Sequence, residues 1–450
     1  MSRDRQQRAL VVGLGVTGLS CTRYLAARDY IVTVVDDRKQ PPMLDELTAT
    51  LRDVDCHTGA WDPRLFDDPG LLVVSPGVSL AEPLIAKAIA NGIPAVGDVE
   101  LFAQAVTAPV LAVTGVNGKS TVTALLGEMC REAGLDTRVG GNIGVPILSL
   151  LESPSPDVHV VELSSFQLET TYSLNAFSAT VLNLGRDHMD RYDSLEQYAA
   201  AKARVFNGDG IMVLNRDDDA VLAMAISGRR QICFGLGPPH GHEDFGLIEA
   251  GSVEWLGNGG QTRVPVDCVP LQGRHNRANA LAAMALAYTM NVPADAMQRA
   301  ISRFQGLPHR SQVVAEHAGV TWVDDSKATN VGATHAALTG ETRPVVLIAG
   351  GRGKGADFRL LKDAVATHAR AVVLIGCDAG LIESALDDVV PVTHASDMID
   401  AVACANELAQ AGDVVLLSPG CASFDMFDNY AHRGEVFTST VRDLIGNVKS

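Results

Sequence analysis

The sequence predicts an α/β protein of three domains. Short runs rich in Val and Ile alternate with helix-like stretches, a pattern typical of parallel sheets covered by helices on both faces. The chain has 450 residues, more than one hydrophobic core usually organises. Gly-rich turns follow two of the runs, at 13–18 and 115–118, and a Gly/Pro break at 306–312 precedes a further α/β stretch. Together these observations indicate three successive sheets.

The apolar runs are expected to be strands because they are short, do not alternate with polar residues and end at turn residues. In chain order they are 9–15, 30–37, 71–77, 110–115, 158–163, 179–184, 211–215, 344–351, 371–376 and 413–420. Residues 233–273 are rich in Gly and Pro and carry only short strand signals, which predicts an antiparallel appendage. Residues 274–304 are expected to be helical. The turns and the break place the domains at 1–97, 98–306 and 307–450, of which the first and third are expected to be Rossmann-like.

Charge and cysteine usage narrow the class of protein. The formal net charge is −17, which disfavours nucleic acid and anionic membranes as partners. The 8 cysteines are scattered and form no C-x-x-C pair, which indicates free thiols in a reducing compartment. We find no apolar stretch long enough to cross a bilayer and no pattern of a secretory signal. A cytoplasmic protein without membrane insertion is expected.

The first Gly-rich turn, “GLGVTG” at 13–18, follows a predicted strand and precedes a predicted helix. Backbone amides of such a turn, at a helix N-terminus, bind a diphosphate. Asp36 ends the next strand at about the spacing from which a dinucleotide site binds ribose. Taken alone, the turn indicates an NAD-dependent dehydrogenase. It fits equally any other ligand that carries a diphosphate.

The second Gly-rich turn is “TGVNGKST”. Gly115 and Gly118 would let the backbone approach phosphate, Lys119 would contact the terminal phosphates, and Ser120 or Thr121 would ligate Mg²⁺. Only two residues separate these glycines, whereas the general P-loop pattern has four. The turn predicts ATP binding by a central P-loop ATPase-like domain. A non-enzymatic ATP-binding switch is the alternative from another class.

Polar residues at the ends of later runs could complete a metal site. Glu162 ends the run at 158–163, and a carboxylate there is costly unless it is paired or bound to a metal ion. His188 lies in a polar cluster after the next run and could ligate a second divalent ion. Lys202 lies on the helix that follows, where a lysine by itself is usually solvated.

Taken together, these motifs resemble the Mur ligase family, ATP-dependent enzymes that form amide bonds in the peptide of bacterial cell-wall precursors. The shortened turn “TGVNGKST” is the family's own form of the phosphate loop. Further matching segments keep the family's order: “GGNIG”, “ELSSFQLE”, “DHMDRY”, “GRHNRANALAA”, “GLPHR”, “DDSKATN”, “GGRGKGADF” and “SPGCASFDMF”. “ELSSFQL” and “SKATN” favour the member that adds D-glutamate to UDP-N-acetylmuramoyl-L-alanine, and a related member that adds another amino acid is the alternative.

The resemblance implies that ATP activates the substrate carboxylate as an acyl phosphate, with two Mg²⁺ ions bound. It implies four catalytic residues: Lys119, Glu162, His188 and Lys202, the last carrying a carbamate. The implied metal ligands are Ser120, Glu162, His188 and Lys202. The implied ATP-binding residues are Gly115, Asn117, Gly118, Lys119, Ser120, Thr121, Asn276, Asn279, Arg310, Asp325 and Lys327.

The resemblance also implies where the other two substrates bind. The residues implied for the UDP-linked substrate are Val16, Thr17, Asp37, Arg38, Gly77, Asn142, Ser164, Gln167 and His188. Those implied for D-glutamate are Thr329, Lys354, Ser423, Phe424 and Tyr430. The expected partners are therefore small molecules, and a monomer is expected.

Overall fold

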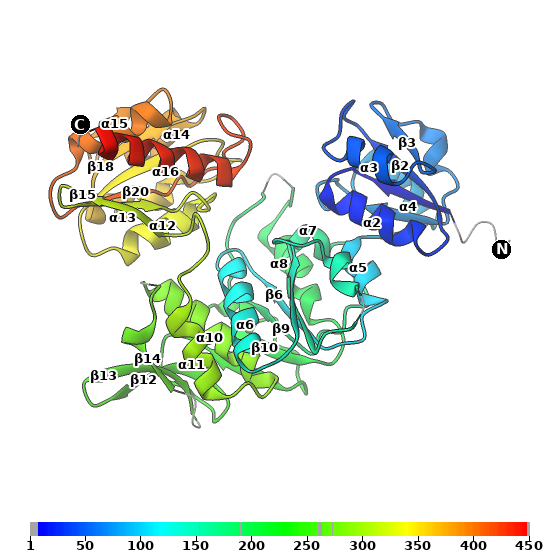
Figure 1. The fold of residues 1–450 in the computed structure, drawn as a ribbon, viewed down its shortest axis with the longest axis horizontal. Coiled ribbons are helices and arrows are strands. Elements are labelled where there is room, and N and C mark those ends of the chain that lie inside the picture. Colours follow the sequence, from blue (N-terminus) through cyan, green and yellow to red (C-terminus); the bar gives the residue numbers. More distant parts are fainter. Residues whose placement is uncertain (1–7, 153, 190, 260–262, 272, 448–450) are drawn as a thin grey trace.

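The computed structural model describes residues 8–152, 154–189, 191–259, 263–271 and 273–447, and it contains three α/β domains (Figure 1). Each domain is built on one sheet. The N-terminal domain, in blue, and the C-terminal domain, in yellow to red, lie on either side of the central domain. The predicted fold class is confirmed.

The N-terminal domain is a five-stranded parallel sheet with helices around it. Its elements are β1 (Arg8–Val12), α2 (Val16–Ala26), β2 (Ile31–Asp36), α3 (Leu44–Thr50), β3 (Asp55–Thr58), η1 (Pro63–Phe66), β4 (Leu71–Val74), α4 (Pro83–Ala90), β5 (Ala95–Val96) and α5 (Asp98–Ala103), which leads to the next domain. The strand order is β3-β2-β1-β4-β5. Because the order reverses between β1 and β4, their carboxyl ends open a crevice of the kind that binds ligands.

The central domain has a nine-stranded sheet. Its elements are β6 (Val110–Thr114), α6 (Lys119–Glu132), β7 (Thr137–Gly141), η2 (Ile147–Leu151), β8 (Val158–Glu162), α7 (Ser165–Leu168), β9 (Ser178–Val181), α8 (Leu195–Ala203), η3 (Arg204–Phe206), β10 (Ile211–Asn215), α9 (Asp219–Leu222), β11 (Gln231–Phe234), β12 (Phe245–Ala250), β13 (Val253–Asn258), β14 (Arg263–Pro265), η4 (Val266–Cys268), α10 (Arg274–Thr289) and α11 (Ala294–Arg303). The order is β14-β13-β12-β11-β10-β9-β6-β8-β7, and the buried helix α10 packs against α6. β12, β13 and β14 pair antiparallel, as predicted, but they continue the sheet through β11 and are not a separate appendage.

The C-terminal domain has a six-stranded sheet with one antiparallel edge. Its elements are β15 (Gln312–His317), β16 (Val320–Asp324), α12 (Val331–Gly340), β17 (Val345–Gly350), η5 (Phe358–Leu361), α13 (Lys362–His368), β18 (Ala369–Ile375), α14 (Ala379–Leu386), β19 (Val392–His394), α15 (Met398–Leu408), β20 (Val414–Leu417) and α16 (Tyr430–Asn447). The order is β15-β16-β20-β17-β18-β19. The strands β17 and β20 are completely buried in the middle of the sheet.

Every apolar run predicted as a strand overlaps one, and the stretch 274–304, predicted to be helical, contains the two helices α10 and α11. The chain leaves the helix between α10 and α11, where Asn291 has a left-handed φ of 57° and Pro293 cannot donate a hydrogen bond. The predicted domain boundaries near 97 and 306 fall between the sheets, and they stay a prediction.

The chemistry expected of the cysteines is confirmed, since all 8 are free thiols. None of the helices in the described parts of the chain combines the length and the apolar character that crossing a bilayer would require.

Candidate active site

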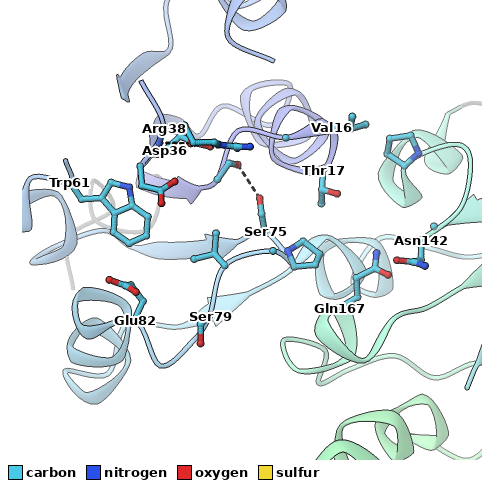
Figure 2. Close-up of a pocket in the computed structure, with 18 of the residues that line it drawn as sticks. Val16, Thr17, Asp36, Arg38, Trp61, Ser75, Ser79, Glu82, Asn142 and Gln167 are labelled. Atoms are coloured by element: carbon cyan, nitrogen blue, oxygen red, sulfur yellow. Dashed lines mark hydrogen bonds and ion pairs between the residues drawn. The ribbon is translucent and has the colours of Figure 1, made fainter. Parts of the chain in front are cut away.

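The first Gly-rich turn joins β1 to α2 and packs closely against the loop after β4. Gly13 has a φ of 93°, and a Cβ added to it would lie 3.0 Å from the Cβ of Ser75. A Cβ on Gly18 would lie 1.8 Å from the carbonyl oxygen of Gly13. Ser75 Oγ donates a hydrogen bond of 2.9 Å to that same oxygen (Figure 2). The turn therefore requires both glycines and presents a helix N-terminus to the crevice.

A cavity of about 1050 Å³ opens in this crevice (Figure 2). It lies between the N-terminal domain and residues 141–146 and 167 of the central domain. Neither Ser164 nor His188 lines it, although both were predicted to contact the ligand. Ser164 instead caps α7 and bonds the side chain of Gln167. The predicted residues that do line the cavity are Val16, Thr17, Asp37, Arg38, Gly77, Asn142 and Gln167.

The carboxylate of Asp36 is not available to a ribose. Its side chain is 1% exposed. Oδ2 accepts hydrogen bonds from the amide of Leu14 at 2.7 Å and from Arg38 Nη2 at 2.6 Å, and Oδ1 accepts two more from Arg38. Burial raises the pKa of Asp36, but these hydrogen bonds lower it more, so the net pKa lies below the ordinary value. The arrangement disfavours the dinucleotide site of the dehydrogenase interpretation.

Sequence reasoning missed two residues at the end of the cavity far from Asn142. Figure 2 shows Trp61 and Glu82 there, beyond Arg38. The indole of Trp61 packs on Phe66 with 5.5 Å between the ring centroids. Its Nε1 is buried and has no hydrogen-bond partner in the structure described. “GAWDP” matches no nucleotide-binding motif, so only the fold could place this aromatic ring in the cavity.

The second Gly-rich turn joins β6 to α6 and also depends on two glycines. Gly115 and Gly118 have φ values of 142° and 87°. A Cβ on Gly118 would lie 2.3 Å from Asn279 Oδ1, a side chain expected to contact ATP. The turn therefore lies directly against α10, and a larger residue at Gly118 would force the two apart.

The shape of this phosphate loop is held by an asparagine that we did not predict. Asn183 Oδ1 accepts hydrogen bonds from the amides of Val116, at 3.1 Å, and Asn117, at 2.8 Å. Lys119 Nζ donates to the carbonyl oxygen of Val116 at 2.7 Å, and burial lowers the pKa of this lysine. The amine therefore lies at the loop, at the start of α6, where phosphate oxygens are bound.

Glu162 connects the wall of the first cavity to the phosphate loop. It ends β8 and is 2% exposed. Its Oε1 accepts a hydrogen bond of 2.7 Å from Asn142 Nδ2, and Asn142 also lines the first cavity. Its Oε2 is buried and has no hydrogen-bond partner in the structure described. His188, in the loop after β9, has its imidazole centroid 4.7 Å from the ring of Phe166.

Lys202 is buried, which corrects its interpretation as a solvated side chain. It is 2% exposed, and its Nζ donates a hydrogen bond of 2.7 Å to the carbonyl oxygen of Gly115 in the phosphate loop. Burial lowers the pKa of Lys202 well below its ordinary value. The charge of Lys119 lowers this pKa further, while Asp187 and Glu162 oppose the shift. A desolvated amine with a lowered pKa therefore lies beside the loop.

A second cavity, of about 170 Å³, separates the phosphate loop from the C-terminal domain. Gly115, Lys119 and Ser120 lie on the loop outside its lining. The predicted ATP-binding residues that line it are Asn117, Gly118, Thr121, Asn276, Asn279, Arg310, Asp325 and Lys327. Two domains thus contribute to one crevice, at the place where the sequence predicted ATP.

The segments after α11 reach the phosphate loop directly. Arg310 Nη2 donates a hydrogen bond of 2.8 Å to Ser120 Oγ, and Asn330 Nδ2 donates one of 3.2 Å to Asn117 Oδ1. Lys327 Nζ lies 3.7 Å from the ring centroid of Tyr430, and burial lowers its pKa to about 8. These cations face a loop built for phosphate.

Family models match most of the chain. “Mur ligase MurD-like, N-terminal domain” matches residues 7–97, “Mur ligase middle domain” matches 113–287, and “Mur ligase, glutamate ligase domain” matches 309–421.

The chain belongs to the Mur ligase family.

Curated relatives of this Mur ligase are similar over their full length. The UDP-N-acetylmuramoylalanine–D-glutamate ligase of Thiobacillus denitrificans is 52% identical and covers 97% of this chain and 96% of its own. That of Methylobacillus flagellatus is 51% identical over 99% of this chain and 98% of its own. Solved Mur ligase structures share the fold. A pseudomurein peptide ligase type C from Methanothermus fervidus has a TM-score of 0.64 at 17% identity, covering 97% of this chain and 100% of its own. The UDP-N-acetylmuramate-alanine ligase of Thermotoga maritima has a TM-score of 0.60 at 18% identity, covering 97% and 99%.

The residues of this Mur ligase fit a magnesium ion at the phosphate loop. Mg²⁺ prefers oxygen ligands and usually keeps water and phosphate oxygens among them. Glu162 Oε2 is a buried oxygen without a hydrogen-bond partner among the described residues, and Ser120 lies in the first turn of α6. No group of three or more His, Cys, Asp or Glu in the described ranges could hold a metal ion by itself. A bound ion would therefore draw further ligands from phosphate or water.

Four of the residues expected to bind D-glutamate lie on three loops of the Mur ligase C-terminal domain, and backbone hydrogen bonds join these loops. The amide of Gly420 donates to Ala328 O at 2.9 Å, and Arg352 and Ala422 exchange hydrogen bonds of 2.8 and 2.9 Å. Ser423 is buried, whereas Phe424 is 67% exposed. The five predicted residues on these loops and at the start of α16 are Thr329, Lys354, Ser423, Phe424 and Tyr430.

Proposed function

We propose that this Mur ligase joins D-glutamate to UDP-N-acetylmuramoyl-L-alanine at the expense of ATP, in peptidoglycan precursor synthesis. Relatives about 50% identical over the whole chain carry that activity in their name. The observation that carries the proposal is the hydrogen bond from Asn142 to Glu162. It joins the wall of a cavity large enough for a nucleotide sugar to a carboxylate at the phosphate loop.

This geometry supports one orientation of the UDP-linked substrate. The reacting carboxylate must lie near Glu162 and the phosphate loop, so it enters past Asn142. The diphosphate then lies at the Gly13 turn and the N-terminus of α2. The base lies at the far end, against Trp61 and Arg38.

The chain's groups are arranged for phosphoryl transfer followed by amide formation. The terminal carboxylate of the substrate would attack the γ-phosphorus of ATP, ADP would leave, and an acyl phosphate would form. The amine of D-glutamate would then attack the acyl carbon, and phosphate would leave with formation of the amide. Lys119 and the loop amides stabilise charge on the transferring group. Bound Mg²⁺, expected as two ions held by Ser120, Glu162, His188 and Lys202, supplies further positive charge.

Lys202 is proposed to carry a carbamate. The addition joins the neutral amine to the carbon of carbon dioxide and releases one proton. Burial beside Lys119 supports it because a lowered pKa favours the unprotonated amine. The product is a negatively charged group with oxygen atoms, which is the ligand type that Mg²⁺ prefers.

The activity is tested by ADP release with UDP-N-acetylmuramoyl-L-alanine and each of D-glutamate, L-glutamate, L-alanine and a diamino acid. Turnover with D-glutamate and with none of the other three amino acids supports the proposal. Turnover with another amino acid assigns the chain a different Mur ligase reaction. Reduction of NAD⁺ by the purified chain would restore the dehydrogenase alternative, and ATP binding without turnover would favour the switch. We propose that the enzyme works as a monomer in the cytoplasm, where ATP and nucleotide sugars are available.

Trp61→Ala should weaken the binding of UDP about tenfold, because an aromatic ring at the base end supplies stacking energy. Isothermal titration calorimetry with UDP measures this loss. Trp255→Ala is the matched control, since its indole Nε1 is also buried without a hydrogen-bond partner in the described structure, but on β13. Equal UDP affinity in the Trp61 variant and the wild type would remove Trp61 from the binding site.

Lys354→Ala should raise the KM for D-glutamate about tenfold or more and leave the KM for ATP nearly unchanged, because a cation that pairs with a substrate carboxylate is lost. Lys354 lies in the glycine-rich loop after β17, with a left-handed φ of 52°. Lys362→Ala is the control, because Lys362 forms a surface ion pair of 2.7 Å with Asp387. Steady-state kinetics decide the point, and equal changes in both KM values would contradict the assigned contact.

A further inference from the structure

Arg191 belongs to the central domain, but its side chain reaches the N-terminal domain. Its Nη1 donates a hydrogen bond of 3.0 Å to the carbonyl oxygen of Pro76, and its Nη2 donates one of 3.1 Å to that of Val78. The same Nη2 pairs with Glu169 Oε2 at 2.7 Å. The side chains of Arg191 and Glu169 are only 15% and 17% exposed. The planar fork of a guanidinium therefore fixes two backbone carbonyls of one domain to a carboxylate of the other.

The guanidinium of Arg191 also stacks on an aromatic ring of the central domain. Its guanidinium carbon lies 4.5 Å from the ring centroid of Phe166. The ring of Phe166 in turn packs edge-on against the imidazole of His188, with 4.7 Å between the centroids. One side chain thus connects the wall of the first cavity to the neighbourhood of a proposed metal ligand.

The loop held by Arg191 keeps its own shape without it. Residues 75–79 line the first cavity. The amide of Ser75 donates to Val12 O at 2.9 Å, its Oγ donates to Gly13 O at 2.9 Å, and the amide of Val78 donates to Ser75 O at 2.9 Å. These hydrogen bonds all lie within the N-terminal domain. Loss of Arg191 should therefore leave the UDP end of the cavity intact.

Other contacts also join these two domains, and they lie away from the loop at 75–79. At the connection between the domains, the amide of Gly97 donates to Thr170 O at 3.3 Å and Gln167 Nε2 donates to Asp98 Oδ2 at 2.9 Å. Helix α2 packs against η2, and Leu19 and Leu25 belong to one buried cluster with Ile147 and Leu148. Apolar contact is not directional, so it joins two domains without fixing the angle between them. Arg191 supplies directional contacts between the same two domains, at the loop that forms the cavity wall.

We infer that Arg191 is a positioning residue that fixes the angle between the N-terminal and central domains, so that the far end of a bound UDP-linked substrate reaches Glu162. This inference rests on the proposed function. The affinity for a ligand that contacts only the N-terminal domain should not depend on the angle between the domains. The affinity for a ligand that spans both domains, from Trp61 to Asn142, should depend on that angle.

The test compares two ligands on the full chain by isothermal titration calorimetry. In Arg191→Lys, which keeps the charge and removes the fork, the Kd for UDP should stay within about twofold of the wild type. The Kd for UDP-N-acetylmuramoyl-L-alanine should rise about tenfold or more, because hydrogen bonds from a charged donor across the domains are lost. The KM for the UDP-linked substrate should rise in parallel while the KM for ATP stays constant.

Arg204→Lys is the matched control. Arg204 also donates to backbone carbonyls near α7, those of Leu168 and Glu169, but all three residues lie in the central domain. It should leave the ratio of the two affinities unchanged. If Arg191→Lys does not fold, Glu169→Gln replaces it. In that variant the Kd for UDP-N-acetylmuramoyl-L-alanine should rise about threefold more than the Kd for UDP. Equal weakening of both ligands, or of neither, overturns the inference, whereas a wild type that binds no UDP overturns the proposed function instead.

Discussion

Replacing Lys119 with alanine should abolish ATP-dependent release of phosphate, a loss of about 10³-fold or more in kcat. Lys119 begins α6 directly behind the phosphate loop, and its Nζ already lies against the loop at the carbonyl oxygen of Val116. Charge develops on the oxygens of the transferring phosphoryl group, and removal of one prearranged donor to such charge typically costs about 10²–10³-fold. A half-buried ammonium at a helix N-terminus should lie at the upper end of that range. A coupled assay of ADP release measures it.

Lys87→Ala provides the control for this variant. Lys87 is exposed and pairs with Asp67 at 3.3 Å on the surface of the N-terminal domain, so its removal should leave turnover unchanged. Thermal unfolding of both variants separates lost chemistry from lost structure. Turnover near the wild-type rate in Lys119→Ala would mean that the loop does not hold the reacting phosphate.

The sequence predicted those parts of the site that are local in the chain. A strand, a turn with glycines at required positions and a helix start occupy one short segment, so the phosphate loop could be recognised from “TGVNGKST”. Glu162 was recognised because a carboxylate at the end of a buried strand is unusual. The same reasoning wrongly suggested that Asp36 could bind a ribose. Its carboxylate instead accepts hydrogen bonds from Arg38 and from the amide of Leu14 within the domain.

The parts that the sequence did not predict depend on contacts between distant segments. The segment “GAWDP” contains no pattern that predicts that Trp61 lines a cavity. The residues next to Asn183 likewise do not indicate that its side chain binds the phosphate loop, some 66 residues earlier in the chain. The burial of Lys202 follows from the packing of α8 against the loop at Gly115, 87 residues away. From its own helix the lysine gave only the signal of a solvated side chain. Such residues become visible only when the domains are assembled.

Replacing Lys202 with alanine should lower kcat about 10³-fold and should be partly reversed by added formate, acetate or propionate. The wild-type amine is buried against Gly115 O, and burial lowers its pKa, which favours the neutral form that adds carbon dioxide. Alanine removes both the amine and its carbamate and leaves a space beside the phosphate loop. A short carboxylate in that space would restore a negatively charged oxygen ligand. Recovery of about tenfold, saturating with acid concentration, is expected in the assay of ADP release.

Lys202→Gln separates this explanation from a structural one. Glutamine cannot be carbamylated, and its side chain fills the space that alanine leaves, so the variant should be inactive and should not respond to added acid. Sodium chloride at equal ionic strength controls for screening in both variants. Wild-type enzyme in ¹³C-labelled bicarbonate should show a carbamate resonance that both variants lack. A Lys202→Ala enzyme as active as the wild type, or a wild type without that resonance, would leave Lys202 a buried lysine that binds only the carbonyl oxygen of Gly115.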